Sequence, residues 1–257
     1  MATMATITAA TANTMPNEAG GDRAGTRPGT RLAGLLAAGA GALLLLGAVP
    51  RLAAAVVSLP ARAVLWDLRE GMRVPPDRLA DAEARLARGA ALADSGTVQA
   101  DRGYLLLNKA LALPPGDAGP VLLRQAAAAT EAGLALSPVQ PAAWARLAWL
   151  RSRMGDPAGA ERALRLSFLS GPVVPAMTVS RIQFGLDLRP HLGAETQQLL
   201  DRQLRLAWVL VPDSMVAMAD RADVGPAVRA ALAGLAPAEI DAYTARWGRR
   251  PPTLPAP

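Results

Sequence analysis

The sequence predicts an all-α protein, in which one N-terminal transmembrane helix precedes a domain of packed helices. Hydrophobic residues make up 51% of the chain but aromatic residues only 4%. Ala and Leu must therefore fill the core, and they favour closely packed helices over sheets. Apolar side chains recur at helical spacing from Asp77 onward. No stretch alternates β-branched or aromatic residues with polar ones, so we expect no strands.

Residues 1–31 are rich in Ala, Thr and Gly without an apolar period, which predicts a disordered tail. Leu32 to Val49 then runs for 18 residues without a charge, close to the roughly 20 residues that cross a bilayer core. A helix kinked at Pro50 would reach about Ser58. We therefore place a membrane anchor at 32–59.

Two other interpretations of this segment stay open. Ala53-Ala54-Ala55 offers small residues for cleavage of a signal peptide, and a buried helix of a soluble protein has a similar composition. Arginines flank the segment on both sides, so the charges do not decide its orientation. A single hydrophobic segment before a large domain commonly acts as an export signal, which favours a cytoplasmic N-terminus and an exported helical domain.

Residues 60–76 form a juxtamembrane linker or helix, in which Trp66 either lies at the membrane interface or packs on the next helices. The helical domain follows at 77–248, and a second disordered tail, rich in proline, at 249–257. Ser95-Gly96, Pro114-Pro115-Gly116 and Pro138 end the first three helices of the domain. After Pro172, helices are expected over 177–188, 194–211, 215–222, 226–235 and 237–247.

One segment of the domain carries a repeat pattern. Pro138 and Pro172 lie 34 positions apart, the period of tetratricopeptide repeats, and two helical patterns flank the corner Gly155-Asp156-Pro157. The segment resembles one such repeat, although Arg151 replaces the usual aromatic residue. The residues that match its packing sites are Trp144, Leu147, Ala148, Ala160 and Leu164. The resemblance implies an α-solenoid of antiparallel helix hairpins, whose first helices line a groove.

Two tryptophans of this repeat have different predicted roles. Trp144 occupies a packing site and should lie in the core. Trp149 comes five residues later, about 140° further round a helix. It should face the inner side of the repeat together with Ser152 and Arg153. An exposed tryptophan beside an arginine often anchors a binding partner, so these three residues are the candidate partner-binding site.

The sequence offers little for catalysis. Without cysteine there is no disulfide, thiolate or cysteine-ligated metal. His191 is the only histidine, in a loop outside any motif, and we expect a surface role. Phosphate-loop, dinucleotide-binding and nucleophile-elbow motifs are all missing. We therefore predict a protein that is not an enzyme and that uses no cofactor and no metal.

The charge pattern does not indicate nucleic-acid binding. The formal charge is +6, but the arginines are spread along the chain with acidic residues among them. Glu83, for example, is followed by Arg85 and Arg88. Such mixed runs are typical of a solvated helix face.

A fainter resemblance links the chain to the VpsP-like polysaccharide-biosynthesis proteins of bacteria. It depends on residues 134–144, on the Leu-Ser-Phe-Leu-Ser-Gly-Pro run that ends at Pro172, and on Arg181 in the next helix. Those proteins are accessory membrane proteins. The resemblance implies a single-pass scaffold of the bacterial inner membrane, with a periplasmic helical domain that binds envelope or polysaccharide-assembly proteins. Alternatives are an accessory factor in cytochrome maturation or cell division, and a polysaccharide-modifying enzyme.

Overall fold

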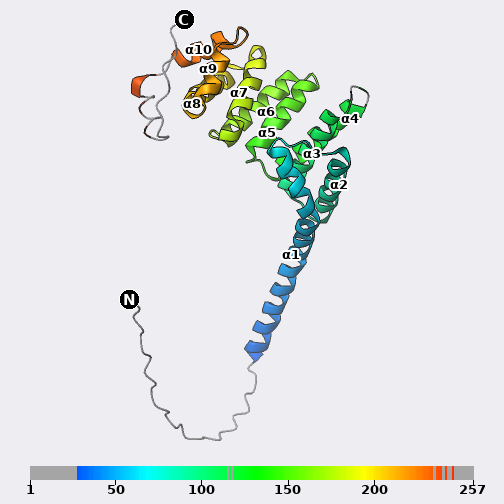
Figure 1. Ribbon diagram of the computed structural model, residues 1–257. Helices are drawn as coiled ribbons and strands as arrows, with labels where there is room; N and C mark the ends of the chain where they lie inside the picture. The colour runs from blue at the N-terminus through cyan, green and yellow to red at the C-terminus, as the bar shows by residue number, and fades with distance from the viewer. Residues whose placement is uncertain are drawn as a thin grey trace, which may run out of the picture. The chain divides into compact units, whose positions relative to one another are not determined.

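The computed structural model describes residues 28–114, 116, 118–233, 236–238, 241 and 245, and these form helices without any strand (Figure 1). The chain divides into two compact units, Met1–Gly47 and Ala48–Pro257. The predicted all-α class is therefore confirmed. The tail predicted at 249–257, most of the tail at 1–31 and most of the helix at 237–247 lie outside the described residues.

The helices begin and end close to the predicted breaks. The helices are α1 (Pro28–Arg69), α2 (Pro76–Leu92), α3 (Gly96–Ala112), α4 (Ala118–Leu136), α5 (Pro141–Arg153), α6 (Pro157–Ser170), α7 (Pro175–Asp187), α8 (Ala194–Leu210), α9 (Pro212–Ala219) and α10 (Gly225–Ala233), with a short 3₁₀ turn at Arg189–His191.

Helix α1 continues through Pro50, as expected, and also through Pro60 to Arg69, so residues 60–69 extend the anchor helix and are not a linker. A proline inside a helix removes one backbone hydrogen bond and costs about 3 kcal/mol. The turns after Pro60 bury Ala61, Val64 and Leu65 against α2 and α3, which offsets part of this cost.

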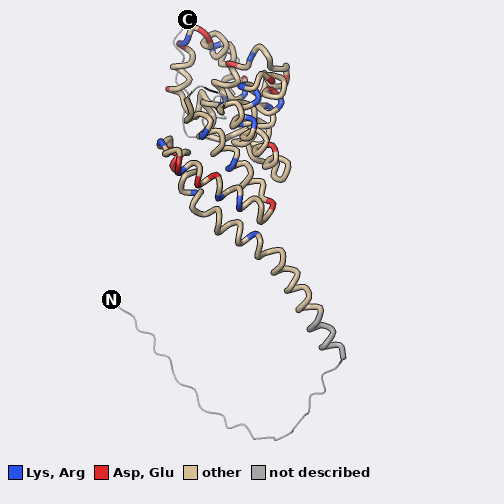
Figure 2. The backbone as a smooth tube through the Cα atoms, turned by 90° about the vertical axis from the view of Figure 1, so that its right-hand side faces the viewer, with Lys and Arg blue, Asp and Glu red and all other residues tan. Residues whose placement is uncertain are grey.

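The part of α1 from Leu36 to Arg69 is long and apolar enough to cross a membrane, with a mean hydropathy of 2.1 in its most apolar window. Only 11% of that window is buried. Leu43 to Leu46 are all exposed, and no charged residue occurs between Leu36 and Pro50 (Figure 2). The most apolar part of α1 therefore contributes little to the buried core.

Proline positions explain most helix starts. At the first position of a helix the missing N–H has no helical partner, and the ring already holds the required φ angle. Among helices α2 to α10, five begin in this way, at Pro76, Pro141, Pro157, Pro175 and Pro212. The corner between α5 and α6 forms as predicted: Gly155 turns the chain at φ +78°, and the Asp156 carboxylate accepts a hydrogen bond from Gly159 N at 2.8 Å.

Consecutive helices pack against each other from α2 to α6 and from α7 to α10, and the contacts of α5 with α7 and of α6 with α8 join these two sets. A small cluster joins α1, α2 and α3, and a large one extends from α3 to α10. Helix α3 belongs to both clusters, with Leu105 in the first and Leu106 in the second. It therefore connects the end of α1 to the rest of the domain.

Helices α3 and α4 approach closely because small residues face one another. A methyl group added at Gly133 would lie 2.7 Å from Ala100 N and from Gly96 O. One added at Gly103 would lie 2.9 Å from Ala126 O. The two backbones therefore pack with no room for a side chain at these glycines.

Arg181 of α7 is 2% exposed and holds three elements together. Its Nη1 donates to Ser167 O at 3.1 Å and to Gly171 O at 2.8 Å, which satisfies carbonyls at the C-terminal end of α6. Its Nη2 donates to Gln203 Oε1 of α8 at 3.0 Å, and its guanidinium lies 5.4 Å from the centre of the Phe168 ring.

Candidate partner-binding groove

A groove of about 880 Å³ opens over the faces of α3, α5 and α7, and the end of α1 closes one side of it. Aromatic and basic side chains mark its lining. These are Arg69, Tyr104, Arg146, Trp149, Arg181 and Phe184. Three helices that lie far apart in the sequence thus present side chains to one concave surface.

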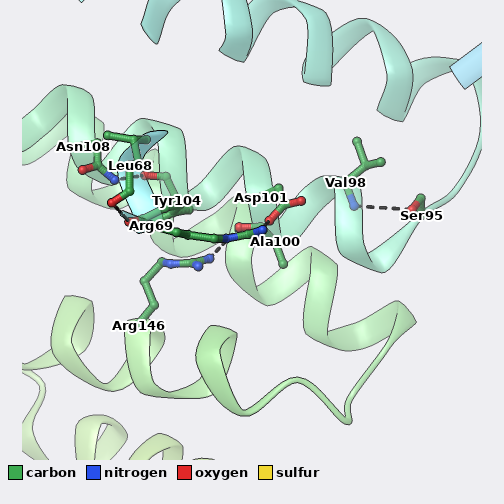
Figure 3. A network of polar contacts seen from close by, with 9 residues as sticks. All are labelled: Leu68, Arg69, Ser95, Val98, Ala100, Asp101, Tyr104, Asn108 and Arg146. Carbon is green, nitrogen blue, oxygen red and sulfur yellow. Dashed lines mark hydrogen bonds and ion pairs between the residues drawn. The ribbon is translucent and has the colours of Figure 1, made fainter. Parts of the chain in front are cut away.

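A polar network lies where α1, α3 and α5 meet (Figure 3). Arg69 Nη2 lies 2.9 Å from Asp101 Oδ1. Arg146 Nη1 donates to Ala100 O at 2.6 Å, and the Arg146 guanidinium stacks over the Tyr104 ring at 4.7 Å from its centre. The Tyr104 hydroxyl donates to Leu68 O at 3.4 Å. The network fixes the angle of Arg146 and ties the end of α1 to α3.

Burial changes the proton affinity of these groups. It lowers the pKa of Arg146 to about 10, although the nearby Asp101 carboxylate opposes the change. It also raises the pKa of Asp101, against the attraction of Arg69 and Arg146. Arg146 therefore stays charged at neutral pH. Three arginines and one carboxylate of the groove lining give it a positive balance, which suits a partner with acidic side chains.

The raised pKa of Asp101 predicts a pH effect on stability. The folded chain binds this proton more readily than the unfolded chain, so the protonated carboxyl favours folding. That contribution is complete below the ordinary aspartate pKa of 3.8 and is lost as the pH rises through the higher pKa of the folded state. Relative to Asp101→Asn, the wild type should gain stability as the pH falls through this window. Urea unfolding of the wild type and of Asp101→Asn at several pH values across this range measures the gain. A difference in unfolding free energy that does not change with pH would show that Asp101 does not take up a proton on folding.

The three predicted site residues have different positions. Trp149 lines the groove and packs half-buried against the core. The Arg153 guanidinium stacks on its ring at 5.5 Å from the centre, while Arg153 is exposed and Ser152 half-buried, and neither belongs to the groove lining. Trp144 packs at the core margin, and its Nε1 donates to Pro138 O at 2.7 Å.

Sequence reasoning did not select Arg69, Asp101, Tyr104 or Arg146. A usable signal existed, because Asp101 with Tyr104, and Arg146 with Trp149, are i, i+3 pairs on the first helices of two successive hairpins. A comparison of the side chains that share one face on successive helices would have grouped these four residues.

Among the described residues, no group of three or more acidic or histidine side chains is placed to hold a metal ion. His191 is exposed in the 3₁₀ turn, as the loop position suggested.

No family model matches this chain, and the search of curated proteins found no significant relative.

Proposed function

We propose that the protein is a membrane-anchored scaffold, whose α3–α5–α7 groove binds a segment of a partner protein. The segment carries apolar or aromatic side chains for the Trp149 and Phe184 surface and carboxylates for Arg69 and Arg146. The groove is the observation that carries the proposal, since it combines aromatic side chains with oriented guanidinium groups.

The helix contacts support a stack of hairpins behind this groove. Helix α5 contacts α7 and α6 contacts α8, so the α5–α6 hairpin packs on the α7–α8 hairpin, with α5 and α7 on the groove side. A solenoid of tetratricopeptide-like hairpins has this contact pattern. Arg151 Nη2, at 2.8 Å from Glu131 Oε1, links α5 to α4 where such repeats usually place an aromatic residue.

The anchor gives the scaffold its place of action. Helix α1 crosses the bacterial inner membrane once and holds the helical domain on the periplasmic side, near envelope or polysaccharide-assembly proteins. Partners in the same bilayer then meet the groove at a raised effective concentration.

Replacing Trp149→Asp with Arg153→Glu should abolish partner capture when the chain is purified from membranes in detergent. Trp149→Asp alone should cause most of the loss, because Trp149 lines the groove while Arg153 stacks on it from outside. Removal of a central tryptophan typically costs at least 2 kcal/mol, about 30-fold in affinity. Quantitative mass spectrometry of the co-purified proteins measures the loss.

Val121→Asp with Arg124→Glu is the matched control. Both side chains are exposed on α4 and lie outside the groove. The two substitutions change the net charge by the same amount as those of the groove variant. Recovery of partners should stay at the wild-type level. Equal recovery with the groove variant and the control would exclude the groove as the binding surface.

A further inference from the structure

Within the Ala48–Pro257 unit, the first turns of α1 have two unlike faces. Leu52, Val56 and Leu59 are 66%, 56% and 54% exposed, whereas Ala54 and Ser58 are buried against the domain. The large exposed apolar side chains of α1 end at Leu59, apart from one tryptophan near the end of the helix. An apolar face that stops within a helix marks the depth at which a bilayer would end.

The C-terminal turn of α2 packs on this same stretch of α1. A methyl group added at Gly89 would lie 2.4 Å from Ser58 Oγ and 3.2 Å from Ala54 O. Two turns that approach so closely lie at one level along α1. The loop that follows α2 is thus held beside the end of the exposed apolar face.

A second groove, of about 720 Å³, opens at this level and is called the α1 groove. Its lining comes from α1, from Leu86 of α2, from residues 93–95, and from Thr97, Val98 and Asp101 at the start of α3. It contains Arg51, Arg62 and Arg69. The spacings of eleven and seven residues place the three arginines on one face of α1.

The charge balance of the α1 groove is positive. Two carboxylates line it, and one of them, Asp101, is paired with Arg69 at 2.9 Å. The other carboxylate is Asp94, so the lining carries three arginines and two carboxylates and has one positive charge in excess. Guanidinium groups bind phosphate oxygens through paired hydrogen bonds. Trp66 lines the same groove and is 62% exposed, an aromatic side chain of the kind that lies among lipid headgroups.

We propose that the α1 groove binds the headgroup of an anionic phospholipid. Arg62 holds its phosphate, Arg51, eleven residues nearer the N-terminus, donates to its ester oxygens, and the acyl chains extend along the exposed Leu52 and Val56. Trp66 lies beside the headgroup. The proposal rests on the membrane anchor of the proposed function but not on the partner groove. Bound lipid would hold the helical domain at the membrane surface.

The test uses the full chain in detergent micelles, titrated with short-chain phosphatidylglycerol or with phosphatidylcholine of the same chain length. Native mass spectrometry counts the bound lipid. The wild type should retain phosphatidylglycerol in preference to phosphatidylcholine. Arg51→Gln with Arg62→Gln should weaken binding of phosphatidylglycerol about 25-fold, roughly fivefold for each arginine. Both side chains are exposed, so thermal unfolding should match the wild type.

Arg73→Gln with Arg88→Gln is the control, because it removes the same charge from exposed arginines outside the α1 groove. It should bind phosphatidylglycerol as the wild type does. An equal loss in both variants, or equal retention of the two lipids by the wild type, overturns the site. Carbonate extraction of native membranes separates the two proposals. A chain that washes off the membrane refutes the anchor, whereas an integral chain without lipid preference refutes the headgroup site alone.

Discussion

Arg181→Ala should lower the free energy of unfolding by about 4 kcal/mol, the largest effect expected from a single side chain outside the glycine contacts. The substitution removes the guanidinium group that donates hydrogen bonds to Ser167 O, Gly171 O and Gln203 Oε1. Each buried group left unpaired costs about 1–3 kcal/mol, and the vacated volume adds a cavity term.

The charge of Arg181 makes these bonds stronger than neutral ones. Burial lowers its pKa to about 10, so the guanidinium is still protonated at neutral pH. It also lies at the C-terminal end of α6, where the helix dipole favours a cation. Arg181→Met fills much of the volume but restores no donor. We therefore expect it to recover only the cavity part of the loss.

Thermal unfolding of the full chain in detergent measures this effect, as a fall in Tm of roughly 10 °C for a domain of this size. Arg202→Ala, an exposed arginine of α8, is the control and should shift Tm by less than about 2 °C. Gln203→Leu should be coupled to Arg181→Ala, since Gln203 Nε2 also holds Pro172 O at 2.7 Å. Strictly additive effects would show that the two residues do not act as one unit.

The sequence was sufficient for helix boundaries, since proline and glycine act on the backbone locally. Pro141, Pro157 and Pro175 each begin a helix because of their own ring geometry. The end of α1 was not predictable in the same way. The tertiary contacts of Ala61 and Leu65 support the helix beyond Pro60, and a local pattern does not contain them.

Ion pairs show the same limit. Glu83 has Arg85 and Arg88 as sequence neighbours, but its carboxylate lies 2.8 Å from Arg102 Nε and 3.9 Å from Lys109 Nζ, both on α3. The pairs thus join α2 to α3, and do not lie along one solvated face. Side-chain spacing on a single helix cannot predict contacts made across a helix interface.

Trp149 lines the groove, but the sequence did not identify the side chains that lie beside it there. Helical side chains lean toward the N-terminus and cover the preceding turn. Trp149 therefore lies over the turn of Arg146, and both line the groove. The turn that follows, with Ser152 and Arg153, falls outside the lining. The direction of the Cα–Cβ bond, and not the spacing alone, decides which partners meet.

Gly133→Leu should destabilise the domain by more than 3 kcal/mol, because the contact at Gly133 is with backbone. The new side chain would begin 2.7 Å from Ala100 N and Gly96 O, atoms that cannot move without displacing α3. Overpacking of a close core contact costs about 1–3 kcal/mol even for small additions. Leucine is a better helix former than glycine by up to about 1 kcal/mol, which does not offset the separation of the two helices.

Gly119→Leu is the matched control on the same helix, since no atom lies within 4 Å of the position where a methyl group would be added. It should leave stability unchanged or raise it slightly through helix propensity. Denaturant unfolding of both variants compares them. If both have the same midpoint, the spacing of α3 and α4 does not depend on Gly133.

Gly133→Leu should also weaken partner capture, although Gly133 does not line the groove. Ala100, whose carbonyl accepts the hydrogen bond from Arg146 Nη1, is the α3 residue that the new side chain would displace. A shift of α3 would release Arg146 and move Asp101 with it. The atoms that the new side chain would meet belong to the backbone of α3. A second substitution to alanine on α3 therefore cannot relieve the clash and restore partner capture. Reduced capture with an intact Trp149 would therefore link the glycine contact to the shape of the groove.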